Sequence, residues 1–285
     1  MLTDSHIDRV VQLALDEDAP WGDITSETFI PAETQATAVL NAREPGILAG
    51  AEVFAAAFRL TDAATSVDLH MADGDHFTSG ATLATVSGPA RALLRAERIG
   101  LNFCQRLSGV ATATRAFVDA VHGTGVHIAD TRKTTPGLRA FERHAVQCGG
   151  GRNHRFSLSD AVMAKDNHLA VLTARGMSIT EAINTARSRL GHTTSIEVEV
   201  DRLDQIEPVI AGGVDIIMLD NFTLDDLRAG VELVARRAVV EASGNVTLAT
   251  VRAIAETGVD VISSGALTHS VRSLDLGLDM ALHGA

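Results

Sequence analysis

Only two lysines occur in the chain, Lys133 and Lys165, and both lie in or next to its most cationic stretch. The other 22 basic side chains are arginines. Residues 132–155 carry a charge of +5 in a chain whose net charge is -12. The six cations of this window are Arg132, Lys133, Arg139, Arg143, Arg152 and Arg155. Clustered like charges repel unless a ligand offsets them, so we expect a small anion rich in carboxylate or phosphate.

Lys165 and the residues around Arg155 are the hardest to explain as ordinary surface residues. Lys165 lies inside an apolar run typical of a buried strand. His154 and Arg155 follow three consecutive glycines, a segment too flexible to hold fixed charge without a ligand or a partner. Arg139 and Arg143 are four residues apart on an expected helix, so one of them is equally well explained as a solvent-facing residue.

Carboxylates at the ends of expected strands form a second candidate group. Side chains alternate along a strand, so Glu197 and Glu199 share one face of the run 195–201, opposite its apolar residues. We expect these acids in the interior or mouth of the fold. Asp220 reaches the mouth from another strand. The same alternation places Glu241 on one side of a third strand, with Ser243.

Buried carboxylates are costly unless a cation or a metal ion compensates them. Glu199 and Asp220 could bind Mg²⁺, or they could pair with Lys133 and Lys165. Simple neutralisation of the nearby cations, without any catalytic role, is the alternative.

Two glycine turns follow the last two expected strands. The first contains Ser243, Gly244 and Asn245, and the second contains Gly265 and Ala266. In many barrels the loops after the final strands hold a phosphate through backbone N–H groups at a helix start. The two turns together predict a phosphate monoester site, whereas either turn alone would be explained as an ordinary connection.

Apolar strands alternate with amphipathic helices after residue 126, which predicts a parallel α/β architecture. The expected strands are 126–132, 161–167, 195–201, 214–221, 238–244 and 259–266. The expected helices are 179–190, 202–211, 224–236 and 248–257. A spacing of roughly 20 residues favours βα barrel units. A full barrel has eight strands, so we expect an incomplete barrel or two strands that the pattern does not reveal.

The first part of the chain has a different pattern. A helix is expected near the N-terminus, followed by a strand-like run at 34–44 and a second helix at 51–60. Two alternating runs around Asp73-Gly74-Asp75 predict a hairpin. Residues 89–121 are rich in helix formers, and Gly109 is expected to break them into two helices.

Composition excludes several classes of protein. The chain has 285 residues, 46% of them hydrophobic and 21% charged, which is typical of a soluble globular protein. No apolar run approaches the roughly 18 residues of a membrane span, and the N-terminus lacks the pattern of a secretory signal. An acidic chain without tyrosine and with one tryptophan does not predict a nucleic-acid surface. Two distant cysteines fit a reducing cytoplasm.

Motifs spread over nearly the whole chain resemble those of the quinolinate phosphoribosyltransferase family, whose activity is also called nicotinate-nucleotide pyrophosphorylase (carboxylating). They are GDITSE, REPGILAG, ERIGLNFCQRLSGVAT, DTRKTTPGLR, GGGRNHR, AKDNH, EVEVD, MLDN, EASGN and SSGALTHS. The resemblance implies an N-terminal α/β sandwich domain at 1–110 and an incomplete α/β barrel at 111–269. It implies that the segment 270–285 packs on the first domain, and that the chain forms a homodimer, or a higher oligomer, with a shared active site.

The resemblance also implies roles for matching residues. Those that would bind the carboxylates of quinolinate and the pyrophosphate of phosphoribosyl pyrophosphate are Arg132, Lys133, His154, Arg155 and Lys165. Arg98 would reach across from the other subunit. Glu199 and Asp220 would hold Mg²⁺ and ribose hydroxyls, and with Lys133 and Lys165 they make up the expected catalytic set. The residues that would hold the 5′-phosphate are Ser243, Gly244, Asn245, Gly265 and Ala266.

The sequence departs from the family pattern at a few positions. Met163 and Ala164 replace bulkier aliphatic residues before the lysine, which could alter the pocket floor. Asn245 stands where some members have glycine. No departure removes a charged group.

The implied reaction transfers the phosphoribosyl group to quinolinate with decarboxylation, giving nicotinate mononucleotide, pyrophosphate and CO₂ in NAD biosynthesis. A related branch linked to molybdenum transport shares much of the pattern. Two other classes remain open on the residues alone. One is a barrel aldolase that uses Lys165 as a Schiff-base amine, and the other is a binding protein that keeps the fold without catalysis.

Overall fold

The computed structural model describes residues 2–174 and 176–282, so the end of the expected segment 270–285 lies outside the described residues. The chain divides into two compact units. The first comprises Met1–Arg115, Thr135–Gly150 and Val271–Ala285, and the second comprises Ala116–Thr134 and Gly151–Ser270. These units differ from the expected domains 1–110 and 111–269 because residues 135–150 group with the first unit. Whether the expected domains fold independently stays a prediction.

The first unit is built on a four-stranded antiparallel sheet with the order β12-β1-β5-β3. Its strands are β1 (Gln35–Ala42), β3 (Ser66–Leu69), β5 (Thr82–Pro89) and β12 (Leu276–Leu282). Every second residue of β1 is buried, as expected for a strand with one face against a core. A separate antiparallel pair joins β2 (Gly46–Ile47) and β4 (His76–Phe77). The two alternating runs expected to form a hairpin do pair antiparallel, as β3 and β5. Their connection is longer than a tight turn, because the Asp73-Gly74-Asp75 turn leads first to β4, which pairs with β2.

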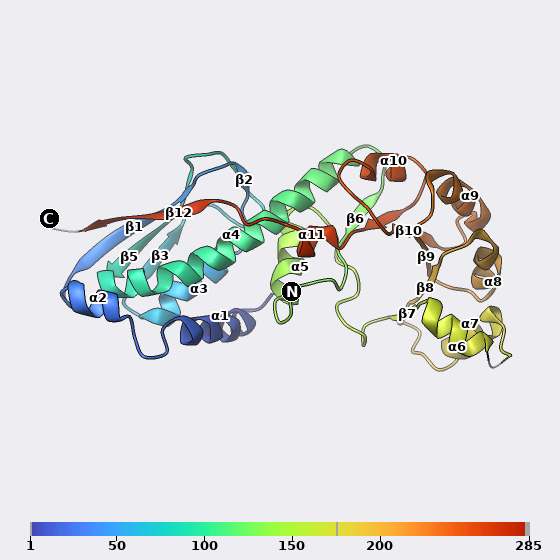
Figure 1. Cartoon of the computed structure of the whole chain (residues 1–285), viewed down its shortest axis with the longest axis horizontal. Helices are drawn as coiled ribbons and strands as arrows, with labels where there is room; N and C mark the ends of the chain where they lie inside the picture. Colours follow the sequence, from blue (N-terminus) through green and yellow to red (C-terminus); the bar gives the residue numbers. More distant parts are fainter. Residues whose placement is uncertain (1, 175, 283–285) are drawn as a thin grey trace. The chain divides into compact units, whose positions relative to one another are not determined.

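Helices cover one face of this sheet, where α3 and the first part of α4 run along the strands (Figure 1). The helices of this unit are α1 (Asp4–Asp18), α2 (Ile24–Phe29), α3 (Ala51–Thr61), α4 (Ala90–Ala120) and α5 (Arg139–Cys148), and α4 continues into the second unit. Two aromatic rings of α3, Phe54 and Phe58, are fully buried and pack with their centroids 4.8 Å apart.

The expected helix break at Gly109 is wrong, since α4 is one continuous helix of 31 residues. Gly109 serves close packing instead. A Cβ atom at this position would lie 2.2 Å from the carbonyl oxygen of Arg272. The helix therefore accepts a glycine in its interior because the segment that leads into β12 passes directly over it.

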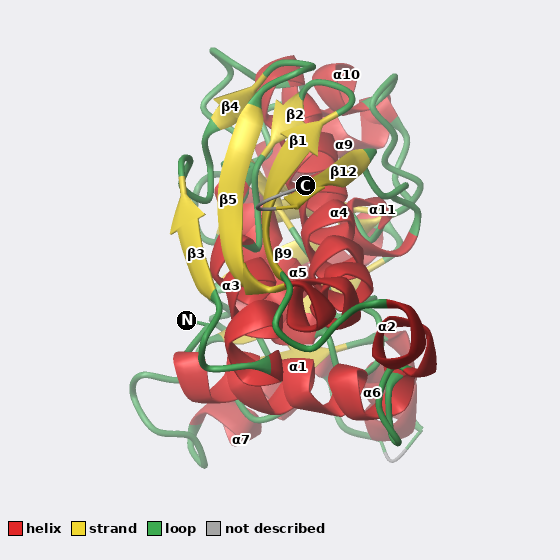
Figure 2. Ribbon diagram, turned by 90° about the vertical axis from the view of Figure 1, so that its left-hand side faces the viewer, coloured by secondary structure: helices red, strands yellow, loops and turns green. Residues whose placement is uncertain are grey.

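The second unit is an open parallel sheet of six strands in the order β6-β11-β10-β9-β8-β7. The strands are β6 (His127–Ala129), β7 (Val162–Ala164), β8 (Ile196–Val200), β9 (Ile216–Asp220), β10 (Val239–Ser243) and β11 (Val261–Ser263). The helices are α6 (Asp166–Thr173), α7 (Ile179–Arg187), η1 (Leu203–Gln205), α8 (Ile206–Ala211), α9 (Leu224–Val234), α10 (Val251–Ala255) and α11 (Ala266–His269). Within the described residues no pairing joins β6 to β7. The expected six-stranded, incomplete α/β barrel is thus confirmed. Figure 2 distinguishes its strands and helices by colour.

No helix in residues 2–174 or 176–282 combines the length and the apolar character that a membrane span requires.

A polar cluster connects the Asp73 turn to α3 and α5 within the first unit. Oδ1 of Asp73 accepts a hydrogen bond from the backbone amide of Ala51 at 2.9 Å, and Oδ2 lies 2.6 Å from Nε2 of His144. The Sγ atom of Cys148 lies 3.5 Å from the same nitrogen. The hydrogen bond to Asp73, with a smaller effect of Cys148, raises the pKa of His144 to about 10.

This shift predicts a pH-dependent stability. A histidine whose pKa is higher in the folded state than its usual 6.5 stabilises the fold below pH 6.5 and loses that effect as the pH rises toward 10. We expect the free energy of unfolding to fall over this range in the wild type and to fall less in His144→Gln. Urea denaturation at several pH values measures it, with His76→Gln, an exposed histidine of the same unit, as control. Parallel pH curves for wild type and His144→Gln would contradict the assignment.

Candidate functional site

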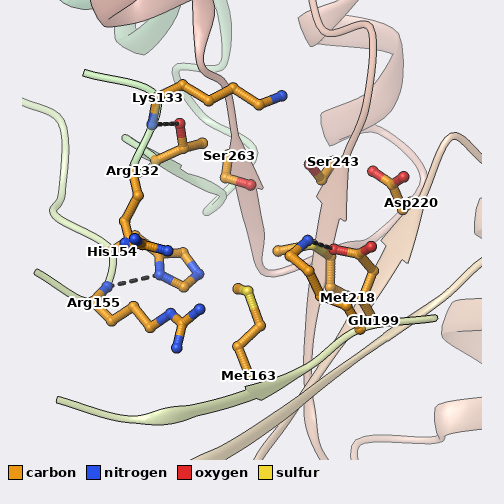
Figure 3. Close-up of a pocket in the computed structure, with 12 residues that line it drawn as sticks. Arg132, Lys133, His154, Arg155, Met163, Glu199, Met218, Asp220, Ser243 and Ser263 are labelled. Carbon is orange, nitrogen blue, oxygen red and sulfur yellow. Dashed lines mark hydrogen bonds and ion pairs between the residues drawn. The ribbon is translucent and has the colours of Figure 1, made fainter. Parts of the chain in front are cut away.

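A pocket of about 370 Å³ opens at the carboxyl ends of the six parallel strands (Figure 3). Its lining residues are Thr131, Arg132, Lys133, His154, Arg155, Met163, Lys165, Glu199, Met218, Asp220, Ser243 and Ser263. All of them belong to the second unit. The carboxyl ends of parallel strands meet at one edge of a sheet, which is why residues far apart in the sequence converge here.

The pocket gathers eight of the residues expected from the sequence, namely Arg132, Lys133, His154, Arg155, Lys165, Glu199, Asp220 and Ser243. Gly244 and Asn245 follow Ser243 directly, and Gly265 and Ala266 follow the end of β11. Arg98 is exposed on α4 in the first unit and does not line this pocket.

Three cationic or basic side chains face the two carboxylates across the pocket. In Figure 3, Arg132, His154 and Arg155 stand on one side, with Glu199 and Asp220 on the other. The ammonium of Lys165 forms an ion pair with Glu199. This contact compensates a carboxylate whose side chain is only 14% exposed.

Lys133 reaches over the second glycine turn. A Cβ atom on Gly265 would lie 2.7 Å from Cδ of Lys133, so the absence of a side chain lets the lysine stem lie against the turn. The hydroxyl of Thr268 donates to the carbonyl oxygen of Lys133 at 2.7 Å, which holds the backbone in place from α11. Among the described residues the Lys133 ammonium has no hydrogen-bond partner, and the side chain is exposed. It is therefore available to an anion.

The first glycine turn interlocks with the end of β9. The side-chain amide of Asn221 donates from Nδ2 to Oδ2 of Asp220 at 2.7 Å, and the side-chain amide of Asn245 donates from Nδ2 to Oδ1 of Asn221 at 3.0 Å. Asn245 has a φ of 50°, a left-handed conformation that asparagine adopts more readily than most residues. This explains how asparagine can stand at a position where a glycine would also fit.

His154 lies deeper, between two buried acids. Its Nε2 atom is 3.1 Å from Glu197 and 3.5 Å from Glu241, which are each 3% exposed. The backbone amide of Arg155 donates to Nδ1 at 2.7 Å. Both ring nitrogens are thus engaged within the protein. The expectation that Glu197 and Glu241 lie in the interior, on the face that leads to the mouth, agrees with these positions.

Opposing effects act on the protonation of His154. Burial lowers the pKa of His154, whereas hydrogen bonds to Glu197 and Glu241 raise it above its usual value. Burial and the charge of Glu241 raise the pKa of Glu197. The amide of Arg155 opposes protonation at Nδ1, because this nitrogen can accept the hydrogen bond only without a proton of its own. The geometry therefore places the ring proton on Nε2, facing the two carboxylates.

Two polar lining residues, Thr131 and Ser263, were assigned no role of their own from the sequence, although Ser263 opens the second glycine turn. The hydroxyl of Ser263 is buried without a hydrogen-bond partner among the described residues, which leaves it free for a ligand. Its sequence signal is weak, because Ser264 follows it and nothing in the pattern distinguishes the two. Met163 and Met218 supply apolar walls between the charged sides.

The donor set at one side of the pocket fits a hard divalent cation. Glu199 and Asp220 lie near the carboxyl ends of the neighbouring strands β8 and β9, and both line the pocket. Mg²⁺ is usually bound by one or two carboxylates together with substrate phosphates. These carboxylates satisfy the protein's part of that requirement.

The close packing of the first glycine turn generates a prediction. Gly244 has a φ of 94°, and a Cβ atom there would lie 2.2 Å from Oδ1 of Asn221 and 2.8 Å from its backbone nitrogen. Gly213 has a φ of 74° with nothing within 4 Å, so Gly213→Ala reports the conformational cost alone. We expect Gly244→Ala to lower the free energy of unfolding by about 1 to 3 kcal/mol more than Gly213→Ala. Equal losses in chemical denaturation would show that Asn221 moves aside freely.

Comparison with known proteins identifies the family. Residues 23–108 match the model of the N-terminal domain of quinolinate phosphoribosyl transferase, and residues 110–279 match the model of its C-terminal domain. The chain is 45% identical to a probable nicotinate-nucleotide pyrophosphorylase (carboxylating) of Bacillus subtilis, over 93% of this chain and 90% of the relative. It is 41% identical to the nicotinate-nucleotide pyrophosphorylase (carboxylating) of Mycobacterium leprae, over 98% and 100%.

Solved structures agree with these relatives. The crystal structure of NadC from Streptococcus pyogenes superimposes with a TM-score of 0.94 at 42% identity and covers 99% of both chains. The nicotinate-nucleotide pyrophosphorylase of Francisella tularensis gives a TM-score of 0.93 at 35% identity, with 99% of this chain and 98% of the other covered. The chain therefore belongs to the quinolinate phosphoribosyl transferase family.

Proposed function

We propose that the protein transfers the phosphoribosyl group of phosphoribosyl pyrophosphate to quinolinate and decarboxylates the product. The reaction yields nicotinate mononucleotide, pyrophosphate and CO₂ and belongs to NAD biosynthesis. The observation that carries the proposal is the single pocket in which Arg132, Lys133 and Arg155 lie opposite Glu199 and Asp220. The names of the curated relatives, nicotinate-nucleotide pyrophosphorylase (carboxylating), support the same reaction.

The cationic side suits the anionic groups of both substrates. Arg132, Arg155 and Lys165 would face the two adjacent carboxylates of quinolinate, because guanidinium groups bind carboxylates in a planar, bidentate manner. Lys133 would meet the pyrophosphate. The turns at Ser243–Asn245 and Gly265–Ala266 would hold the 5′-phosphate through their backbone N–H groups. These assignments rest on the pocket and on the resemblance of the motifs.

Mg²⁺ is the proposed cofactor, with Glu199 and Asp220 as its protein ligands or as partners of the ribose hydroxyls. The ion would neutralise part of the charge on the pyrophosphate. Lys133 would stabilise the departing pyrophosphate as the ribose C1 gains oxocarbenium character and the pyridine nitrogen attacks. The pyridinium formed in this step then stabilises the carbanion left by loss of CO₂ from the adjacent carbon, and this carbon takes up a proton to give nicotinate mononucleotide. Catalysis would thus arise from positioning and electrostatics.

The aldolase alternative finds less support in the pocket. A Schiff-base lysine must react as a neutral amine, whereas Lys165 is ion-paired with Glu199. The anion-binding groups around it also exceed what a small carbonyl substrate requires.

A homodimer with shared active sites is part of the proposal, and a higher assembly of such dimers is compatible with it. Arg98 is exposed in the first unit, and the motif around it resembles the family segment that reaches into the site of the other subunit. We also propose a cytoplasmic location, because Cys104 and Cys148 are both free thiols. No nucleic-acid or membrane partner is proposed.

The reaction is tested with purified protein, quinolinate, phosphoribosyl pyrophosphate and Mg²⁺. We expect mononucleotide, pyrophosphate and CO₂ in equal amounts, and none of them after chelation of Mg²⁺. Lys165→Ala is expected to lower kcat by about 100-fold or more with the fold retained. Arg228→Ala, which removes an exposed ion pair with Asp225, serves as control. Full activity of Lys165→Ala would remove this lysine from the site, and failure with quinolinate but turnover of another aromatic base would reassign the substrate.

Mixing two inactive variants tests the shared site. Arg98→Ala and Lys165→Ala would each be inactive alone. If Arg98 serves the partner's pocket, a hybrid dimer of the two variants contains one intact site, and an equimolar, re-equilibrated mixture should recover about one quarter of the wild-type activity. A mixture as inactive as its components would show that each site is built from one chain.

A further inference from the structure

Two buried carboxylates lie one level below the pocket and do not line it. Glu197 precedes Glu199 by two residues on β8, and Glu241 precedes Ser243 by two residues on β10. Side chains two apart share a face of a strand, so each acid lies directly beneath a pocket residue. β9 separates the two strands, and side chains from alternate strands meet in one layer of a barrel interior.

His154 joins this layer to the pocket. The Nε2 atom faces Glu197 at 3.1 Å and Glu241 at 3.5 Å, while Nδ1 accepts from the backbone amide of Arg155 at 2.7 Å. The amide of His154 itself donates to the fully buried Asp130 at 2.7 Å. The ring therefore cannot hydrogen-bond a ligand unless one of these contacts breaks. Its position makes it a link between the buried acids and Arg155.

Glu197 and Glu241 do not contribute favourably to the stability of the fold. One oxygen of each, Oε1 of Glu197 and Oε1 of Glu241, is buried without a hydrogen-bond partner among the described residues. Buried polar groups that are incompletely satisfied destabilise a fold, and well-packed apolar residues in their place are often neutral or stabilising. A feature that costs stability directly under a substrate pocket points to a functional role.

We propose that Glu197 and Glu241 are positioning residues that act through His154 on Arg155. The two carboxylates hold the imidazole with Nε2–H directed into the sheet, and Nδ1 then fixes the Arg155 amide. Arg155 enters the pocket with its guanidinium further held by the carbonyl oxygen of Ala161, to which Nη1 donates at 3.0 Å. The identity of the ligand that Arg155 meets, a pyridine dicarboxylate, rests on the proposed function.

The test compares apolar and conservative replacements. In Glu197→Met/Glu241→Met the acceptors are lost but the volume is nearly kept, whereas Glu197→Gln/Glu241→Gln keeps an acceptor for Nε2–H. We expect the methionine variant to bind quinolinate at least tenfold more weakly by calorimetry, with an unfolding midpoint no lower than that of the wild type. The glutamine variant should remain within about threefold of the wild type. Wild-type affinity in the methionine variant overturns the proposal, as does a loss that merely follows a drop in stability.

Asp215→Asn is the matched control for disturbance of β8. Asp215 accepts the amide of Ile196 at 2.7 Å at the opposite end of this strand and does not reach the pocket. Its quinolinate affinity should stay within twofold of the wild type. A tenfold loss here would show that any perturbation of β8 weakens binding, and would overturn the specific role of the acids.

A double-mutant cycle tests whether the acids act through the ring. In a His154→Ala background, the two methionine substitutions should change quinolinate affinity less than twofold, because the link to Arg155 is already broken. A further tenfold loss in that background means that the acids reach the ligand by another route, which overturns the relay.

The state of the ring gives a readout that does not depend on any substrate. Nitrogen NMR of labelled protein should find His154 with a proton on Nε2 and none on Nδ1, and this preference should be lost in the methionine variant. A proton on Nδ1 in the wild type overturns the relay. An unprotonated Nε2 in the wild type would also overturn the relay. This outcome would indicate a bound metal ion, because the ligand atoms of His154, Glu197 and Glu241 lie within 4.8 Å of one another. If the wild type binds no quinolinate but shows this tautomer, the proposed function fails and the relay stands.

Discussion

Compensation of charge at the carboxyl ends of six parallel strands is the constraint on which the second unit depends. Each strand brings a polar or charged group to the same edge of the sheet, and the strand positions fix the distances between these groups. Lys165 neutralises Glu199, and His154 occupies the space between Glu197 and Glu241. What remains is an exposed excess of positive charge at Arg132 and Lys133. The pocket is therefore matched to anions before any ligand arrives.

Eight of the residues named from the sequence line one pocket, and for those on strands this placement follows from alternation, which is a strict geometric rule. Side chains two residues apart on a strand lie on the same face of the sheet. Glu197 could therefore be placed on the face of Glu199, and Glu241 on the face of Ser243, without knowledge of the fold. The number of strands followed from the alternation of apolar runs with amphipathic helices. Ser263 lies at the start of the second glycine turn, but no role was assigned to it because a serine at a strand end carries no signal of its own.

Local sequence patterns were least informative where a residue serves a distant contact. Gly109 has the low helix propensity expected of a helix break. The helix needs a glycine there because a side chain would clash with the carbonyl oxygen of Arg272, more than 160 residues later in the chain. The Asp73-Gly74-Asp75 turn has the composition of a hairpin, yet Asp73 binds the start of α3 and a histidine of α5. Residues 135–150 follow the cationic loop in sequence but pack with the first unit. Such long-range partners leave no periodic trace that a single sequence can reveal.

The sheet of the first unit joins distant parts of the chain, since Asn41 on β1 hydrogen-bonds Asp279 on β12, 238 residues away. During synthesis β1 leaves the ribosome long before the strand that covers its edge exists. The second unit lies wholly between them in the chain and can complete its sheet first. Until then β1 presents open backbone hydrogen-bonding groups, a risk for pairing with other nascent chains. The alanines of β1 limit how strongly such wrong pairings would hold, because their small side chains bury little apolar surface.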